Sequence, residues 1–408
     1  MLEAELPSLR SLTEAVGSVM SSPGVHQHDR LILVKCILEQ VQAEELAGLV
    51  SCQFLVWERL NTGHWAEVWP GWRTLYGLVS LARLRLTVRL LGEGRCRQEK
   101  DVLKDLVKMC DLGLLLGGPD ILDGALETLA QSLTDYLASS PTVSHRSDSP
   151  VNKKPKLSSN FCDIKQHSLP LSQPLEDIPV LQYPDIPTFV TQCKTRGLVT
   201  KLCGAMEDWP ALTSWSVERL VRLAGPRTVP VEIGRRYTDH DWTQQLMTVE
   251  SFARDFLGPS PSRVGYLAQH QLLDQVPSLG QDILTPDYCY TGNSDQPEVN
   301  VWIGPAGTVS PAHTDNKHNL LCQVLGYKYV AIFYQDMTDS LYPDLEPMFH
   351  NTSRVDLDHP DTEMFPLVQQ LKGHHTILGP GEMLYIPPRV WHYVRSLDIS
   401  FSVSFWWE

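Results

Sequence analysis

Several features that mark common protein classes are missing from this sequence. Its 408 residues contain no apolar run of the roughly 18 residues that a membrane-spanning helix needs. The acidic start, Met1-Leu-Glu-Ala-Glu-Leu-Pro, lacks the basic-then-apolar order of a signal peptide. These absences predict an intracellular protein that does not enter a membrane.

Paired cysteines and positive charge are also scarce. The nine Cys are scattered, with no C-x-x-C pair, which argues against a disulfide framework and a structural zinc site. The 34 Lys and Arg against 48 Asp and Glu give a net charge of −14. An acidic chain repels phosphate backbones and attracts basic partners. We therefore expect no direct nucleic-acid binding, and expect basic proteins or peptides as partners.

The first part of the chain has the apolar spacing of helices. Residues 31–40 and 72–83 carry apolar side chains three and four positions apart, and residues 98–137 continue the pattern. This spacing predicts a helical, repeat-like domain over residues 1–140, with a role in interaction or in packing.

The composition changes sharply over residues 141–174. This stretch begins rich in Ser and Pro and poor in large apolar residues, which predicts a disordered linker. Within it, Lys153-Lys-Pro-Lys156 resembles a short nuclear import signal, and a solvated basic spot is an equal alternative. The run predicts location in the nucleus, with the cytoplasm as a second compartment.

Residues 175–408 have the pattern of short strands. Runs rich in β-branched and aromatic residues are separated by Gly and Pro, and the clearest are residues 229–233, 299–303, 328–333 and 400–406. Many short strands with regular turns predict a double-sheet jelly roll. The expected fold class is therefore α+β, a helical domain followed by a β jelly roll.

The strongest candidate site combines His313-Thr-Asp315 with the later His392. Two imidazoles and one carboxylate form the facial triad of non-haem Fe(II) oxygenases. On an extended strand, residues two apart point the same way, so one strand would supply His313 and Asp315. His392 would come from another strand, in a hairpin-like setting after the turn Gly379-Pro-Gly-Glu.

An H-x-D triplet alone is not diagnostic. The chain has 14 His, and a second triplet, His359-Pro-Asp361, lies in a polar stretch that contains proline. Because no strand surrounds it, this second triplet is predicted to be a solvated turn.

With the residues around it, the triad resembles the JmjC family of Fe(II)- and 2-oxoglutarate-dependent oxygenases. The H-x-D motif, Lys328, the Gly379-Pro-Gly-Glu turn and Pro388-x-x-Trp-His392 follow in the family's order. The ending Phe401–Trp407 is most similar to a branch with a helical N-terminal half, described as arginyl hydroxylases and also as demethylases or peptidases. The resemblance covers residues 175–408 and implies a double-stranded β-helix of the cupin-like kind, with O₂ as a further co-substrate.

The resemblance also implies residue roles. Fe(II) would bind His313, Asp315 and His392. The distal carboxylate of 2-oxoglutarate would pair with Lys328, because a buried Lys is costly without an anion; the alternative is a Lys that reaches the surface. Other contacts to 2-oxoglutarate would come from Tyr266, Ser310 and Asn319, with Ser310 as a plain turn residue equally compatible.

Substrate contacts follow from the residues themselves. Glu232 lies among strand residues that are otherwise apolar, and a substrate guanidinium would satisfy its carboxylate through two hydrogen bonds. Gln269, Trp302 and Trp406 would complete a pocket for a planar cation. The alternative is core packing for both Trp and an internal salt bridge from Glu232 to one of Arg235, Arg236 and Arg395.

These expectations predict an oxygenase that hydroxylates arginine side chains of basic proteins, such as histone or ribosomal proteins. The rivals are demethylation of methyl-lysine in histone tails, metal-dependent proteolysis of histone tails, and a silent binding module. Many relatives dimerise through helices that follow the barrel, and this chain ends at Trp407-Glu408, so we expect a monomer.

Overall fold

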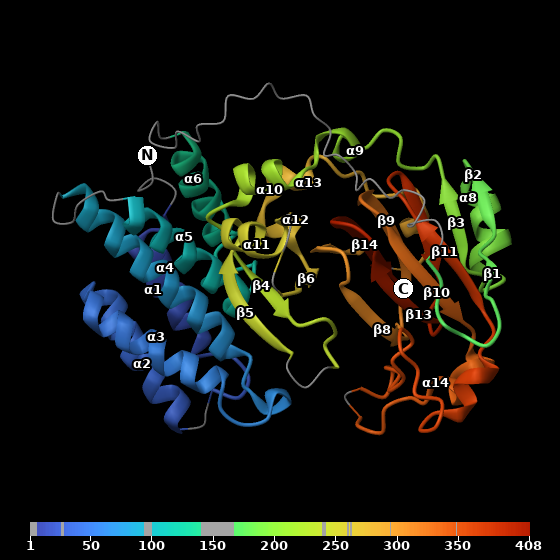
Figure 1. The fold of residues 1–408 in the computed structure, drawn as a ribbon. Coiled ribbons are helices and arrows are strands. Elements are labelled where there is room, and N and C mark those ends of the chain that lie inside the picture. Colours follow the sequence, from blue (N-terminus) through green and yellow to red (C-terminus); the bar gives the residue numbers. More distant parts are fainter. Residues whose placement is uncertain are drawn as a thin grey trace. The chain divides into compact units, whose positions relative to one another are not determined.

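The computed structural model divides into two compact units (Figure 1). One comprises Met1–His145, Val221–Val229 and Thr248–Glu250, and the other comprises the remaining residues. The predicted linker lies outside the described residues as far as position 166, and so does the basic run 153–156. The structure describes residues 6–25, 28–93, 100–139, 167–238, 242–258, 261, 263–293, 295–347 and 349–408.

Helices build the first unit. Gly77 on one helix and Gly117 on the next allow close packing, because a Cβ added at Gly117 would lie 3.0 Å from the Gly77 Cα. The helical N-terminal half was predicted correctly. The helices are α1 (Leu9–Val19), α2 (His28–Ala43), α3 (Leu46–Leu60), η2 (Trp65–Glu67), α4 (Gly71–Gly92), α5 (Lys100–Gly117) and α6 (Ala125–Ser139).

A buried ion pair holds residues 221–229 in this unit. Arg227 donates from Nε to Asp111 Oδ1 at 2.9 Å, and the Thr228 amide donates to Asp111 Oδ2 at 2.5 Å. Both charged side chains are 0% exposed. Such a pair is costly to break, because removal of one partner leaves the other charge buried alone.

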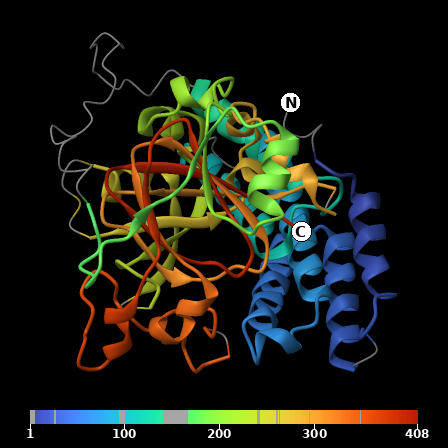
Figure 2. The ribbon, with the colours of Figure 1, turned by 90° about the vertical axis from the view of Figure 1, so that its right-hand side faces the viewer.

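Two sheets form the β part of the chain, and in Figure 2 the strands curve around a common interior. The first contains, in spatial order, β1 (Glu176–Asp177), β11 (His374–Leu378), β10 (Lys328–Phe333), β13 (Trp391–Ser396) and β8 (Val309–His313). The second contains β2 (Val180–Gln182), β3 (Thr200–Cys203), β12 (Glu382–Ile386), β9 (His318–Leu325), β14 (Ser400–Trp407), β7 (Glu298–Gly304), β6 (Gly265–His270), β4 (Thr228–Ile233) and β5 (Thr243–Thr248).

Short helices connect the strands. They are α8 (Ile186–Phe189), η3 (Val190–Lys194), α9 (Ala211–Ser214), α10 (Val217–Ala224), α11 (Val249–Phe256), α12 (Leu272–Gln275), α13 (Pro277–Gly280), η4 (Asp287–Thr291), η5 (Gln335–Met337), α14 (Thr338–Leu341) and η6 (Pro366–Gln370). Among all described helices, none has both the length and the apolar character needed to cross a bilayer.

The strands after β7 pass back and forth between the two sheets. β8, β10, β11 and β13 belong to the first sheet, whereas β9, β12 and β14 belong to the second, so the chain changes sheet at every step except between β10 and β11. This alternation is the jelly roll that the strand pattern predicted. The hairpin-like setting proposed for His392 is wrong, since β12 pairs with β9 and β3 while β13 pairs with β10 and β8. Pro387 and Pro388 lie between β12 and β13, and their missing N–H groups cannot extend a ladder.

An apolar cluster lies between the sheets next to the site. Side chains alternate along a strand, so Lys328, Val330 and Ile332 of β10 share one face. Val330 and Ile332 pack in a buried cluster with Leu321 and Leu384 from the opposite sheet. Lys328 therefore points toward the same interior.

Candidate metal centre

Three side chains with metal-binding atoms meet between β8 and β13. His313 lies opposite His392 in the β8–β13 register, and the two ring centroids are 4.2 Å apart. Asp315 Oδ1 is 4.0 Å from His313 Nε2, and Asp315 Oδ2 is 3.6 Å from His392 Nε2. One donor atom from each residue lies within 4.8 Å of the others. A single ion can therefore reach all three.

The position of Asp315 relative to the strand differs from the prediction. β8 ends at His313, so Asp315 lies just beyond the strand rather than on it. The ladder stops because the Thr314 amide donates to the carbonyl of Asn351 at 2.9 Å. The Asp315 carbonyl accepts from the Arg389 amide at 2.6 Å, which fixes the loop that carries the carboxylate.

Both imidazoles are oriented by the same backbone contact. Nδ1 of His313 lies 2.7 Å from the Pro311 carbonyl oxygen, and Nδ1 of His392 lies 3.0 Å from that of Val390. An N–H on each Nδ1 would donate to the carbonyl, which leaves the Nε2 lone pair for a metal. Burial lowers the pKa of His392 to about 4, so this ring is neutral at physiological pH, as a ligand must be.

The donor set fits a non-haem iron. Two neutral imidazoles and one carboxylate form a facial triad that leaves the other coordination positions open. Oδ2 of Asp315 is buried and accepts no hydrogen bond from the described residues. A bound cation would supply the partner that this oxygen lacks.

A cavity of about 370 Å³, which includes its open mouth, adjoins these three side chains. The cavity gathers all four predicted 2-oxoglutarate contacts and two of the four predicted substrate contacts. Besides the three ligands, it is lined by Tyr266, Trp302, Ser310, Asn319, Leu321, Lys328, Ile386, Val394, Ser404 and Trp406.

Lys328 is the buried cation of this cavity. Its side chain is buried, so the alternative of a Lys that reaches the surface is excluded. Nζ donates to the Tyr266 hydroxyl at 3.2 Å and lies 5.6 Å and 6.0 Å from the ring centres of Tyr266 and Trp302. Of the described acids, none is paired with it. Burial lowers the pKa of Lys328 to about 7, and an anion in the cavity would restore its charge.

Two further buried polar atoms in the cavity lack protein partners. Asn319 Oδ1 and Trp406 Nε1 form no hydrogen bond with the described residues. Buried polar groups are normally hydrogen-bonded, so these two atoms indicate space for a polar ligand.

Glu232 on β4 lies beside Tyr266, which is one of the residues that line the cavity. It is opposite Tyr266 in the β4–β6 register, and its charge raises the pKa of that tyrosine after the larger effect of burial. Glu232 is half-buried, and burial raises its own pKa. Within the described residues, its hydrogen-bond donor is the Trp242 indole, with Nε1 at 3.3 Å.

The predicted internal salt bridges of Glu232 are not formed. Arg235 and Arg395 both bind the buried Asp358, at 2.5 Å and 2.6 Å, and Arg236 binds Asp356 at 2.7 Å. These pairings occupy all three arginines that were predicted as partners of Glu232. The carboxylate of Glu232 is therefore left without a cationic partner among the described residues.

Tyr237 and Trp242 were not predicted. Tyr237 is hydrogen-bonded to Thr352, which bridges to His313. The pKa of Tyr237 is raised to about 12, mainly by burial and to a smaller extent by the charges of Asp315 and Glu232, so this hydroxyl lies near both carboxylates. Both aromatic residues lie between β4 and β5, where strand periodicity gives no signal.

Gln269 is separated from the other predicted substrate contacts. It is exposed at a bulge in β6, has a φ of 46°, and is not among the residues that line the cavity. Gln269 is three positions from the cavity residue Tyr266, so the alternation of side chains along a strand already places it on the opposite face. The second H-x-D triplet is a turn with His359 exposed, as predicted.

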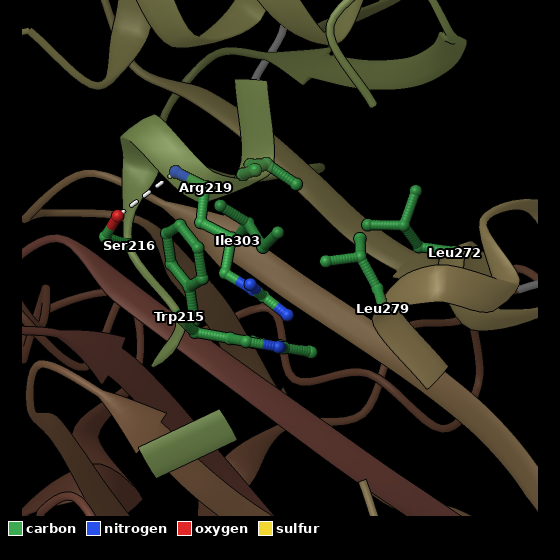
Figure 3. Close-up of a pocket in the computed structure, with 8 residues that line it drawn as sticks. Trp215, Ser216, Arg219, Leu272, Leu279 and Ile303 are labelled. Carbon is green, nitrogen blue, oxygen red and sulfur yellow. Dashed lines mark hydrogen bonds between the residues drawn. The ribbon is translucent and has the colours of Figure 1, made fainter. Parts of the chain in front are cut away.

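A second cavity lies on the other side of Ile303, among α10, α12 and α13 (Figure 3). Its walls are mostly apolar, with Trp215, Leu272 and Leu279 around the Arg219 side chain. Arg219 is already paired with Asp282 at 2.7 Å. This cavity offers packing space rather than a reactive group.

Comparisons with known proteins agree with this geometry. Residues 200–408 match the cupin-like domain family. The chain is 40% identical over 394 residues to lysine-specific demethylase 8 of Danio rerio, across 93% of each chain. It is 39% identical over 383 residues to Jumonji C domain-containing protein 5 of Drosophila melanogaster, across 90% of this chain and 88% of the relative. It is 34% identical over 425 residues to lysine-specific demethylase JMJ30 of Arabidopsis thaliana, across 100% of this chain and 95% of the relative.

Proposed function

This chain belongs to the JmjC family of Fe(II)- and 2-oxoglutarate-dependent oxygenases, and we propose that it hydroxylates arginine side chains of protein substrates. The observation that carries the proposal is Glu232, a half-buried carboxylate beside the cavity without a cationic partner among the described residues. A guanidinium would supply the charge and two parallel hydrogen bonds.

We assign different roles to the residues of the cavity. His313, Asp315 and His392 would hold Fe(II), and Lys328 would neutralise the distal carboxylate of 2-oxoglutarate. When bound, iron, 2-oxoglutarate and O₂ supply the oxidising power for C–H hydroxylation. Tyr266, Ser310 and Asn319 would add hydrogen bonds that orient the co-substrate.

The substrate side is expected to be aromatic and acidic. Trp302 and Trp406 line the cavity, and the Trp242 indole is held by Glu232. Indole faces attract planar cations, and a carboxylate between them fixes the orientation of the cation. This arrangement would hold the arginine side chain near the metal and exclude water.

Demethylation of methyl-lysine is the second candidate. Relatives at 40% and 34% identity are named lysine-specific demethylases, which favours this substrate. The chemistry is the same hydroxylation, since a hydroxylated N-methyl group leaves as formaldehyde. A methylated ammonium would also lie against Glu232 and the indoles, but it offers fewer hydrogen bonds than a guanidinium.

Mass spectrometry of matched peptides separates these reactions. Full-length protein with Fe(II), 2-oxoglutarate and O₂ would be incubated with basic peptides that differ only in a central Arg, Lys or methyl-Lys. We expect one added oxygen atom on the Arg peptide. Methyl-Lys peptides that lose methyl groups with formaldehyde, while Arg peptides stay unchanged, would overturn the arginine assignment. Cleavage that persists without 2-oxoglutarate would indicate the peptidase.

Two variants control this experiment. His313→Ala should abolish turnover of 2-oxoglutarate with any peptide. Glu232→Gln should keep the slow turnover that occurs without substrate and form much less of the Arg product at a low peptide concentration. A Glu232→Gln enzyme that hydroxylates Arg normally would remove the observation on which the substrate class rests.

We further propose basic protein partners, a monomeric state and a nuclear location. The net charge of −14 supports the partners, and the run 153–156 supports the location. Alanine replacement of the basic run should shift the tagged full-length protein toward the cytoplasm. An unchanged distribution would contradict the import signal.

A further inference from the structure

Helices α2 and α3 form a hairpin in the first unit (Figure 1). Glu44 and Glu45 connect them, which places the two helices side by side and antiparallel. The helices are in close contact near the connection, because a Cβ on Gly48 would lie 1.7 Å from Oε1 of Gln40.

One helical turn beyond this contact, each helix carries a cysteine. Cys36 precedes Gln40 by a turn, and Cys52 follows Gly48 by a turn, so both thiols lie on the facing sides of the hairpin at one level. The two thiols are close enough that Cys36 raises the pKa of Cys52 after the larger effect of burial, and both are free in the structure.

The two sulfurs differ in their access to solvent. Cys36 is half-buried, whereas Cys52 is 2% exposed. Burial raises the pKa of Cys52 to about 12, so that this thiol stays protonated. A dissolved oxidant would therefore meet Cys36 first and find Cys52 already in contact.

We propose that Cys36 and Cys52 are a disulfide-forming pair that hydrogen peroxide oxidises in the folded protein. The Cys36 sulfur takes one peroxide oxygen to form a sulfenic acid, and the O–O bond breaks with release of water. The Cys52 sulfur then forms the S–S bond while the sulfenic oxygen leaves as a second water with the Cys52 proton. Two thiols are oxidised, and one peroxide is reduced.

The cross-link would join α2 to α3. It closes the chain between the two cysteines and so removes conformational freedom from the unfolded state. The hairpin should then resist local opening, and the reaction should be reversed by dithiothreitol.

Peptide mapping tests the pair directly. Full-length protein would be treated with hydrogen peroxide, denatured, alkylated with iodoacetamide and digested with trypsin. Both cysteines fall in one tryptic peptide, Cys36–Arg59, which contains no internal Lys or Arg. The expected product is this peptide without alkylation and lighter by two hydrogen atoms. Cleavage after Glu39 or Glu44 should then give fragments that remain joined.

Cys110→Ser is the matched control, because Cys110 is a buried thiol of the same unit whose charged neighbours are Asp111 and Arg227. This variant should form the cross-link as the parent does, and Cys36→Ser should leave Cys52 open to alkylation after denaturation. The oxidised parent and Cys110→Ser should unfold at a higher temperature than their reduced forms, and Cys36→Ser should not.

Two results would overturn the proposal. One is peroxide oxidation that adds oxygen atoms to Cys36 while Cys52 stays alkylatable. The other is a disulfide that forms in equal yield in denaturant, because its formation would then not depend on the folded structure. Both are decided on the parent protein, so a variant that fails to fold does not affect the outcome.

Discussion

The two most deeply buried cations among the described residues have opposite environments. Arg227 is paired with Asp111 in the first unit, and both side chains are 0% exposed. Lys328, in the cavity, is 1% exposed and has only the Tyr266 hydroxyl and two aromatic rings beside it. A buried charge is costly unless it is neutralised. The first cation is satisfied by the protein, and we infer that a ligand satisfies the second.

The acids repeat this contrast. Asp358 is buried and bound by both Arg235 and Arg395. Burial raises its pKa, but the Tyr393 hydroxyl and the charges of the two arginines outweigh this effect and lower it. The pKa of Glu232 is raised by burial, and no described cation lowers it. The difference separates a carboxylate that holds the fold from one that is available to a substrate.

We expect a large loss of stability when the buried pair of Asp111 and Arg227 is broken. Asp111→Ala leaves a buried guanidinium alone and should lower the free energy of unfolding by about 3–5 kcal/mol. Urea denaturation measures this loss. The turnover of each folded molecule should be unchanged, because neither partner lies in the cavity. A loss below about 1 kcal/mol would mean that the pair contributes little to stability.

Glu232→Gln should weaken substrate binding without destabilising the fold. It removes a half-buried charge that has no cationic partner among the described residues, so the free energy of unfolding should stay the same or rise. The KM for an Arg peptide should increase roughly tenfold or more, since a charge-assisted hydrogen bond contributes about 1.5–3 kcal/mol. Steady-state kinetics measure the change, and Asp358→Asn, which should destabilise the fold, is the contrasting variant.

A further predicted effect is a pH dependence of the free energy of unfolding. The pKa of Lys328 is about 7 in the fold, against about 10.4 in an unfolded chain. Below pH 7 both states carry the proton, and the full cost of the buried charge is present. Between these two pKa values the unfolded state binds more protons, so stability should rise with pH. Urea denaturation at several pH values should give a higher free energy of unfolding for Lys328→Met than for the parent. This difference in free energy should narrow as the pH rises from 7 to about 10.4. A difference that stays constant with pH would contradict the lowered pKa of Lys328.

The sequence was enough to find His313, Asp315, His392 and Lys328, because their order and spacing are shared with a known family. It was not enough to place the chain around them. Residues 382–396 have the local pattern of a hairpin, and only long-range pairing assigns β12 and β13 to different sheets.

Local features limited the rest of the prediction. Gln269 lies on the face of β6 opposite to Tyr266, and Tyr237 lies in a connection without strand periodicity. The contact between Cys36 and Cys52 depends on how α2 and α3 pack, which the scattered spacing of the cysteines does not reveal.

The central claim is that an anionic ligand neutralises the buried charge of Lys328. Thermal unfolding with and without 2-oxoglutarate, in the presence of Mn²⁺, tests it on the parent, on Lys328→Met and on the control Lys201→Met, whose Lys pairs with Glu382. We predict that 2-oxoglutarate raises the unfolding temperature of the parent and of Lys201→Met. Without 2-oxoglutarate, Lys328→Met should unfold at the same temperature as the parent or higher. Addition of 2-oxoglutarate should not raise the unfolding temperature of this variant. An equal gain in all three proteins would contradict the account.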